Sequence, residues 1–410
     1  MITPQQVLAL RDETEIGPAL GLSKASDESL GGYLELAAAL LQENAAVAGV
    51  VLSELVTAAV TRNLLPLAGE ASYLDARACL VRGMLEDALV RIDRAADYWL
   101  RGGEPIKSAR TGLGRMNVLD DLGRHREAIQ VGEALLQRLD RLDEDARADG
   151  EAVWLRAATL ENVGVARGYL GDHAAALAAY QQAEEVYQNN DMADEIARPM
   201  ANRGVELIEL GRLDDAVAAL VTAAADFDRL GDSLFAAKCF AYEARAQMLR
   251  GDYTASAAAA DRAGEYLTSQ PPTTEYARIQ LVRAETLASM NLLADSVQLT
   301  ERLIDQFAAA GLEHDLAAAH FVRAVSRTRL GAAEAIEDFV EAEKRYESVG
   351  DAAMAAVARL GRSQLVDDLE AEQLVMAAVA VLRSSGRPVD WVAAELRLSQ
   401  LADDSAAALE

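Results

Sequence analysis

Apolar residues recur along the chain at helical spacing, and turn-forming residues interrupt them about every 20 residues. One set of turns is marked by glycine within a recurring Leu-Gly-Arg or Leu-Gly-Asp phrase, as at 122–124, 170–172 and 210–212. A second set falls half a period later, at Gly102-Gly103, Gly231, Gly311 and Gly350. Short breaks between helix-length segments are typical of stacked antiparallel helix pairs. The pattern therefore predicts an all-α protein.

The first set of turns repeats with a period of 40 residues. The interval is 40 from Gly83 to Gly123, from Gly171 to Gly211 and from Gly211 to Gly251, and Asn291 lies midway between Gly251 and Gly331. The interval from Gly123 to Gly171 is 48, and we assign the eight extra residues to a charged extension around 140–147. Extrapolation predicts further units anchored near 43 and 371.

Small residues occupy fixed places in each unit when the anchor glycine is counted as its fifteenth residue. The eighth residue is Ala76, Gly164, Gly204, Ala244, Ala284 or Ala324, and the twentieth is Ala48, Ala88, Ala128, Ala176, Ala216, Ser256 or Ser296. Small side chains at these places allow two helices to cross at 8–10 Å. The pattern resembles the tetratricopeptide repeat (TPR), with a 40-residue period in place of 34. The residues at these turns are similar to those at the turns of TPR arrays associated with bacterial CHAT-domain proteins.

This resemblance implies a right-handed α-solenoid, a TPR-like superhelix of about 8–9 antiparallel helix pairs with capping helices. We expect a cap segment at 1–28 with a helix at 4–11, the repeat array at 29–384, and a capping helix and tail at 385–410. Units are expected near 43, 83, 123, 171, 211, 251, 291, 331 and 371. The last helix should bury Trp391, Ala394, Leu398 and Leu401 on one face.

The charge of the chain narrows the choice of partners. With 39 Lys and Arg against 66 Asp and Glu, the net charge is −27, which disfavours nucleic acid and anionic membranes as ligands. The N-terminus has no basic and apolar leader, and no segment is long and apolar enough to span a bilayer. Two distant cysteines fit a reducing compartment. We therefore expect a cytoplasmic protein.

Residues that carry chemistry are few and scattered. His125 and His173 occupy the same place in two units, where Tyr253 and Leu213 stand in others, which indicates a packing position. His314 and His320 are six residues apart, a spacing that does not place both on one helix face for a metal. Cys79 fits a small buried core position. The sequence predicts no catalytic constellation, no metal and no cofactor.

The strongest indication of a binding surface is a row of positively charged side chains. The TPR resemblance implies that the first helix of each unit lines a concave groove, and cations recur there at the second and ninth positions of successive units. With nearby polar and aromatic residues, the candidates are Arg77, Arg110, Asn117, Asn162, Arg198, Asn202, Lys238, Tyr242, Arg245 and Arg278. They would hold an acidic peptide, a C-terminal carboxylate or a phosphorylated segment. The alternative is that each cation pairs with a carboxylate of the neighbouring unit and stiffens the array.

These observations predict a non-enzymatic scaffold that binds a protein or peptide in its concave groove, in bacterial signalling, regulation or defence. The alternative function is a regulatory or sensor subunit of a separately encoded effector enzyme, such as a CHAT-type protease. A subunit of that kind should expose a large apolar patch at one end of the array.

Overall fold

The computed structural model describes residues 6–7, 16–22, 25–141, 149–267, 273–383, 385 and 387–407. Its regular elements are helices, and no strand occurs in these ranges. The chain divides into two compact units, Met1–Leu119 with Gln130–Leu155, and Asp120–Ile129 with Arg156–Glu410. The helix expected at 4–11 lies almost wholly outside the described residues, and so does most of the extension at 140–147.

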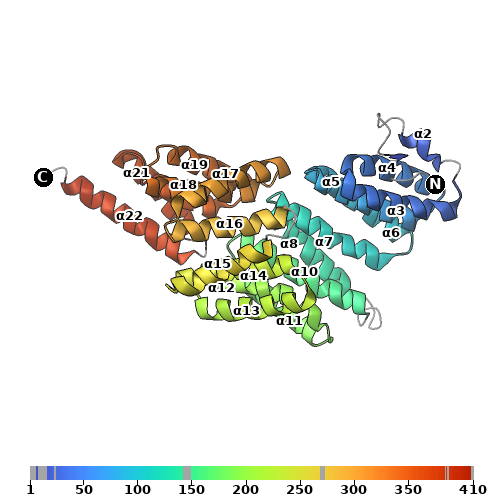
Figure 1. Ribbon diagram of the computed structural model, residues 1–410, viewed down its shortest axis with the longest axis horizontal. Coiled ribbons are helices and arrows are strands. Elements are labelled where there is room, and N and C mark those ends of the chain that lie inside the picture. The colour runs from blue at the N-terminus through green and yellow to red at the C-terminus, as the bar shows by residue number, and fades with distance from the viewer. Residues whose placement is uncertain are drawn as a thin grey trace. The chain divides into compact units, whose positions relative to one another are not determined.

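The first unit is a series of consecutive helices joined by short turns (Figure 1). It contains α2 (Ile16–Leu20), α3 (Asp27–Glu43), α4 (Ala45–Thr61), α5 (Leu65–Val81), α6 (Leu85–Arg101) and most of α7 (Pro105–Asp121) and α8 (His125–Asp140). Within it the Gly112-Leu113-Gly114 segment allows close packing. A Cβ on Gly112 would lie 2.9 Å from the Leu135 side chain, and one on Gly114 would lie 2.9 Å from the Tyr73 hydroxyl.

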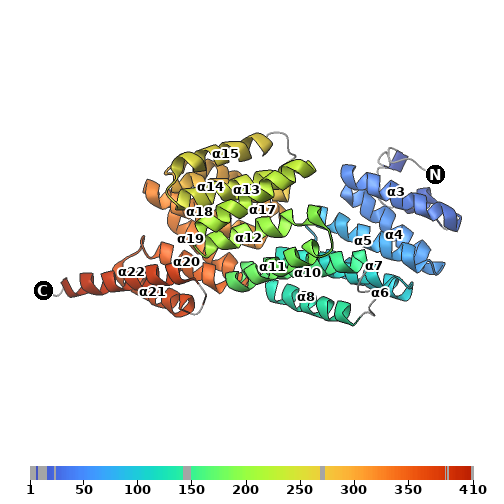
Figure 2. The same ribbon diagram turned by 90° about the horizontal axis from the view of Figure 1, so that it is seen from below.

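The second unit continues the series and ends with three helices at the C-terminal side (Figure 2). Its helices are most of α10 (Gly150–Tyr169), then α11 (His173–Gln188), η3 (Ala193–Glu195), α12 (Ala197–Glu209), α13 (Leu213–Leu230), α14 (Ser233–Leu249), α15 (Tyr253–Leu267), α16 (Thr274–Ser289), α17 (Leu293–Ala310), α18 (Glu313–Leu330), α19 (Ala335–Ser348), α20 (Ala352–Arg362), α21 (Asp368–Leu382) and α22 (Pro388–Ala407). From α11 to α15 and from α16 to α22 each α-helix packs on the next α-helix, and α14 also packs on both α12 and α16. The first helices of successive pairs therefore adjoin one another.

Small residues stand where the two helices of a pair cross. A Cβ on Gly164 would lie 2.6 Å from the Tyr180 ring, and one on Gly204 would lie 2.7 Å from Leu220. In later pairs the crossing includes a hydrogen bond, because Ser256 Oγ donates to the Ala244 carbonyl at 2.8 Å. The predicted eighth and twentieth positions thus meet at Ala244 and Ser256 and again at Ala284 and Ser296, while the eighth-position glycines of earlier pairs face a large side chain of the second helix. A larger side chain at these places would push the helices apart.

The anchor glycines form the turn between the first and the second helix of each pair. Gly83, Gly123, Gly171, Gly211, Gly251 and Gly331 all have φ between 70° and 81°. Asn291 takes the equivalent place with φ 64°, which fits the tolerance of asparagine for the left-handed region. At the extrapolated anchors, Glu43 ends α3 and Ala371 lies within α21.

The last helix packs as its sequence predicts. Ala394 and Leu401 of α22 are buried, and Trp391 and Leu398 pack on the clusters that include Ala378 and Val375 of α21. Among the described helices, none has an apolar stretch long enough to cross a membrane.

Replacement of Gly164 by alanine tests the crossing geometry. Alanine is the better helix former, but its Cβ would clash with Tyr180, so we expect Gly164→Ala to lower the free energy of unfolding by about 1–3 kcal/mol. Gly264→Ala in α15 is the matched control, because its Cβ would meet only the Arg283 guanidinium at 3.6 Å. The control should be neutral or stabilising by up to about 1 kcal/mol. Urea denaturation of both variants measures the difference, and equal effects would contradict close packing at Gly164.

Candidate functional site

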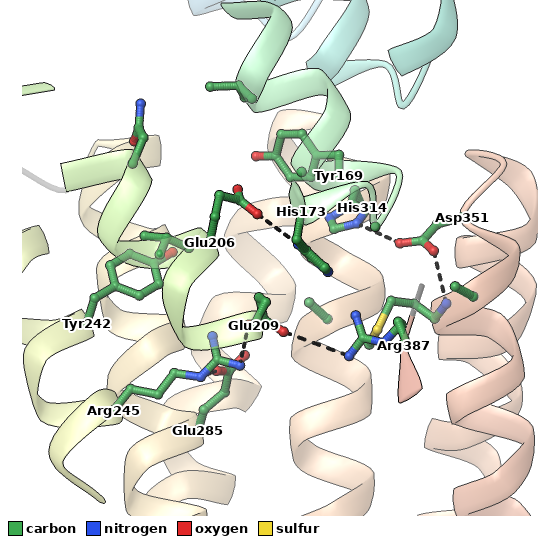
Figure 3. A pocket seen from close by; sticks show the side chains of 18 of the residues that line it. Tyr169, His173, Glu206, Glu209, Tyr242, Arg245, Glu285, His314, Asp351 and Arg387 are labelled. Atoms are coloured by element: carbon green, nitrogen blue, oxygen red, sulfur yellow. Dashed lines mark hydrogen bonds and ion pairs between the residues drawn. The ribbon is translucent and has the colours of Figure 1, made fainter. Parts of the chain in front are cut away.

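A pocket of about 310 Å³ lies within the second unit. Its walls come mainly from the first helices of successive pairs and from the turns beside them, and the second helices add Tyr180 and Tyr346. Figure 3 shows most of the lining side chains. The residues that line it are Val165, Gly168, Tyr169, Gly171, His173, Tyr180, Asn202, Val205, Glu206, Glu209, Lys238, Tyr242, Arg245, Glu285, His314, Ala318, Tyr346, Asp351, Ala353, Met354 and Arg387. The lining thus combines aromatic rings with charged groups of both signs.

The 40-residue period explains why these residues meet. Asn202 and Tyr242 are 40 residues apart, and so are Val205, Arg245 and Glu285. Because α12, α14 and α16 pack side by side, equivalent positions on them become neighbours on one surface. The pocket is therefore a product of the repeat rather than of one specialised loop.

Arg245 joins three consecutive first helices. Its Nη2 donates to Glu209 Oε1 of α12 at 2.8 Å, and its Nε lies 3.6 Å from Glu285 Oε2 of α16. Arg387 approaches Glu209 from the other side, at 4.0 Å. Burial by itself would raise the pKa of Glu209, but Arg245 and Arg387 outweigh it and hold that pKa below its usual value. Burial raises the pKa of Glu285, with Arg245 opposing the shift.

Two histidines of the pocket each face a carboxylate of another helix. His173 Nδ1 lies 2.7 Å from Glu206 Oε2, and His314 Nε2 lies 3.2 Å from Asp351 Oδ2. Asp351 also caps α20, because its Oδ1 accepts from the Met354 amide at 2.9 Å. These pairs fix the ring orientations and join successive helices across the pocket (Figure 3).

Behind the pocket, Glu161 of α10 is buried against α12. Asn202 Nδ2 donates to its Oε1 at 3.1 Å, and the Arg198 guanidinium lies 4.0 Å from the same oxygen. Burial raises the pKa of Glu161 to about 7, although Arg198 and Lys238 oppose the shift. Both cations also lie over the Phe235 ring, at 5.8 and 5.7 Å from its centre. Asn202, Arg198 and Lys238 thus surround one partly neutral carboxyl group.

The structure brings four of the ten predicted binding residues together in the pocket: Asn202, Lys238, Tyr242 and Arg245. Arg198 lies beside them through Glu161, and Asn162 is half-buried on α10 outside the lining. Arg278 binds Asp315 at 2.9 Å and Asp121 at 2.7 Å instead of facing the pocket. Arg245 and Arg278 therefore pair with carboxylates of neighbouring helix pairs, which is the alternative that the sequence left open.

The other three candidates lie on the first unit. Arg77 and Asn117 are exposed on α5 and α7. Arg110 lies 3.6 Å from Glu151, and its guanidinium is 5.0 Å from the centre of the Trp154 ring. These residues do not contribute to the pocket.

Sequence reasoning missed the carboxylates of the pocket, Glu206, Glu209, Glu285 and Asp351, and also Arg387. It assigned His125 and His173 to packing, and His125 is indeed buried and stacked on Tyr169 at 4.7 Å between ring centres. His173 is buried as well but also lines the pocket. The spacing of two of the carboxylates could have indicated them. Glu209 precedes Arg245 by 36 residues and Glu285 follows it by 40, so each lies about one repeat period from Arg245. Cys79 is buried, as expected.

No family model matches the sequence, and no curated protein does so significantly. Three solved structures share the fold at low identity. A Rap protein complexed with competence and sporulation factor has 13% identity and a TM-score of 0.53, covering 93% of this chain and 99% of its own. The Rap conjugation gene regulator of plasmid pLS20, in complex with the Phr* peptide, has 15% identity and a TM-score of 0.52, covering 87% of this chain and 96% of its own. Aspartyl phosphate phosphatase F from Bacillus subtilis has 12% identity and a TM-score of 0.56, covering 82% of this chain and 89% of its own.

The chain has a TPR-like helical-repeat fold. This fold confirms the all-α solenoid predicted from the turns and the small residues. The likeness to CHAT-associated arrays stays a prediction. One of the three similar structures carries the name of a phosphatase, so the fold by itself does not decide between a binding protein and an enzyme.

Replacement of Arg245 by glutamine tests the central ion pair. The change leaves Glu209 and Glu285 without their shared cation at a half-buried site, so we expect a loss of about 1–3 kcal/mol in the free energy of unfolding. Arg212→Gln is the control, because Arg212 pairs with Asp215 at an exposed site on the same unit. It should cost less than about 1 kcal/mol. Denaturant titration at pH 7 compares them, and a loss for Arg245→Gln no larger than for the control would refute a structural role.

Replacement of Glu161 by glutamine tests the buried carboxyl group. Its pKa is about 7 in the folded chain against an ordinary value of 4.5, so its stabilising protonated form is fully present below pH 4.5 and is lost as the pH rises through 7. The glutamine oxygen can still accept from Asn202. We therefore expect the stability of Glu161→Gln relative to the unmodified chain to rise by about 2–3 kcal/mol between pH 5 and pH 8. Exposed Glu185→Gln should show no such trend, and a flat difference for Glu161→Gln would be contrary to expectation.

Proposed function

We propose that this protein is a non-enzymatic interaction scaffold that binds an extended peptide segment in the pocket of its second unit. The observation that carries the proposal is the lining of that pocket by equivalent positions of successive first helices. A row of this kind presents polar groups at regular intervals, as an extended backbone requires. Two proteins of similar fold were solved with bound factors, one of them named a peptide.

Three side chains are the proposed contacts for the ligand. Asn202 offers an amide that can bond to a peptide backbone, and Tyr242 offers an aromatic surface with a polar end. Lys238 supplies positive charge at the same wall. Arg245 is already held by two carboxylates, so in this proposal it positions the wall rather than taking the ligand.

The cations beside the pocket indicate which charge the ligand should carry. Arg198 is 47% exposed, and Lys238 lies beside it over Phe235. These two cations support a segment with an acidic side chain or a free C-terminal carboxylate. We further propose that the chain acts in the bacterial cytoplasm in signalling, regulation or defence.

A selection from a displayed library of randomised heptapeptides with free C-termini tests this function. We expect the unmodified chain to enrich peptides, and the double variant Arg198→Gln, Lys238→Gln to bind them at least about tenfold more weakly, because a hydrogen bond to a charged group contributes about 1.5–3 kcal/mol. Fluorescence anisotropy with the enriched peptides measures the affinities, and thermal unfolding checks the fold.

The matched control is Arg77→Gln with Arg110→Gln, which removes the same charge from two candidate residues outside the pocket. It should keep full affinity. Failure to enrich any peptide, or equal binding by both double variants, would argue against recognition in the pocket.

A second candidate function is that of a regulatory subunit of a separately encoded effector, for which a CHAT-type protease remains our first suggestion. The observation that favours it is the last helix, where Val389, Val392 and Leu396 are exposed to solvent.

A further inference from the structure

A buried carboxyl group lies directly behind the proposed binding wall of the pocket. Glu161 of α10 is 3% exposed, and its Oε1 accepts a hydrogen bond from Asn202 Nδ2 at 3.1 Å. Asn202 and Lys238 line the pocket, and the Arg198 guanidinium lies 4.0 Å from the same Glu161 oxygen. Glu161 therefore adjoins the groups that we propose as ligand contacts, although it does not line the pocket itself.

Another carboxyl group of the second unit shows what distinguishes Glu161. Glu243 is also buried, and its partner Arg262 also lies over an aromatic ring, that of Phe240, at 4.4 Å. Arg262 Nη2 donates to Glu243 Oε2 at 2.8 Å, which is a full hydrogen bond. The contact of 4.0 Å between Arg198 and Glu161 is longer than a hydrogen bond, so the Arg198 guanidinium can still donate to another acceptor.

The charge of Glu161 depends on the ionisable groups around it. Those that interact with it electrostatically are Arg198 of α12, Lys238 of α14, Glu195 of η3, and Tyr180 and Tyr187 of α11. The two cations favour the ionised carboxylate, but burial outweighs them and raises the pKa of Glu161 to about 7. At neutral pH a further charge beside the group is therefore enough to change its protonation.

An acidic group of a ligand would bring such a charge. Arg245 is held by two carboxylates and Arg387 by Asp390 at 2.5 Å. Lys238 and Arg198 are therefore the cations that an acidic ligand group would approach. Such a group competes with Glu161 for the same two cations, and its negative charge favours the protonated form of Glu161.

We propose that Glu161 takes up a proton when an acidic group of the ligand binds Arg198 and Lys238, so that ligand binding and proton uptake are coupled. Protonation removes the competing charge, while the Glu161 carboxyl oxygen still accepts from Asn202. The affinity for such a ligand is highest below pH 7 and falls as the pH rises above it, because the proton is then harder to supply. Glu161 is thus a positioning residue that acts through the two cations. The inference rests on the proposed function, since it concerns the same binding wall.

The titration of Glu161 itself tests the coupling. The full chain is labelled with ¹³C at the glutamate side-chain carboxyl, and Glu161→Gln identifies the resonance. The probes are acetate, which presents a carboxylate alone, and acetamide, its neutral counterpart, each at about 0.1 M with sodium chloride to equalise the ionic strength. We expect acetate to raise the midpoint of the Glu161 titration by at least about 0.5 pH, and acetamide to leave it unchanged.

The same coupling should appear in the affinity. A midpoint raised by about 0.5 pH corresponds to about threefold tighter acetate binding well below pH 7 than well above it, because linkage is reciprocal. Heptapeptides enriched by the library selection should likewise bind at least about threefold more tightly at pH 6 than at pH 8.5. His173 and His314 also line the pocket, so the pH effect is assigned to Glu161 only if Glu161→Gln abolishes it.

Glu243 is the matched control within the same labelled sample, because it is buried beside an arginine but does not line the pocket. Its midpoint should not respond to acetate. Arg198→Gln with Lys238→Gln should abolish the response of Glu161, with thermal unfolding as the check on the fold. An unchanged Glu161 midpoint in acetate, an equal response of Glu243, or a response that persists in the double variant would overturn the proposal.

Failure of this inference can be told from failure of the proposed function. If the selection enriches peptides but the Glu161 midpoint ignores acetate, peptide binding stands and the coupling is rejected. If acetate raises the midpoint but no peptide is enriched, the coupling to a carboxylate stands and peptide recognition is rejected.

Discussion

The close crossing of the two helices in each pair is the constraint on which the rest of the second unit depends. Gly164 and Gly204 leave no room for a Cβ, and Ser256 is bonded directly to the facing backbone. Because the crossing recurs every 40 residues in this unit, successive first helices pack side by side. Residues 40 apart in sequence therefore become neighbours in space, and the pocket is lined by such neighbours.

The 40-residue repeat also brings arginines and carboxylates of successive first helices into contact. Arg245 lies between carboxylates of the preceding and the following first helix, and Arg278 of α16 binds Asp315 of α18, the next first helix. When a half-buried arginine leaves two carboxylates, it leaves them without the cation that offsets their burial, which costs free energy. These ion pairs therefore hold the pocket wall in one arrangement before any ligand arrives, which reduces the ordering cost of binding. Polar groups beside them, such as Asn202 and Lys238, are left in fixed positions along that wall.

The pocket and the last helix differ in physical character. The pocket is concave, contains charges of both signs and suits a short extended segment. The last helix, α22, instead exposes an apolar stripe of Val389, Val392 and Leu396 to solvent. The pocket supports the function of a scaffold, and the stripe supports that of a regulatory subunit.

The amino-acid sequence by itself determined the fold, because helix pairs are specified locally. Glycine at a left-handed turn and alanine or serine at a crossing act within about 20 residues, and both are visible in the pattern around Gly171, Gly211 and Gly251. It also identified Asn202, Lys238, Tyr242 and Arg245 as facing one surface. It did not show that Arg245 and Arg278 are held by carboxylates, nor that Arg387 and Asp351 reach the same pocket as His173. Those contacts join residues as far apart in sequence as Glu209 and Arg387. Only the accumulated rotation of one helix pair on the next decides which distant side chains meet.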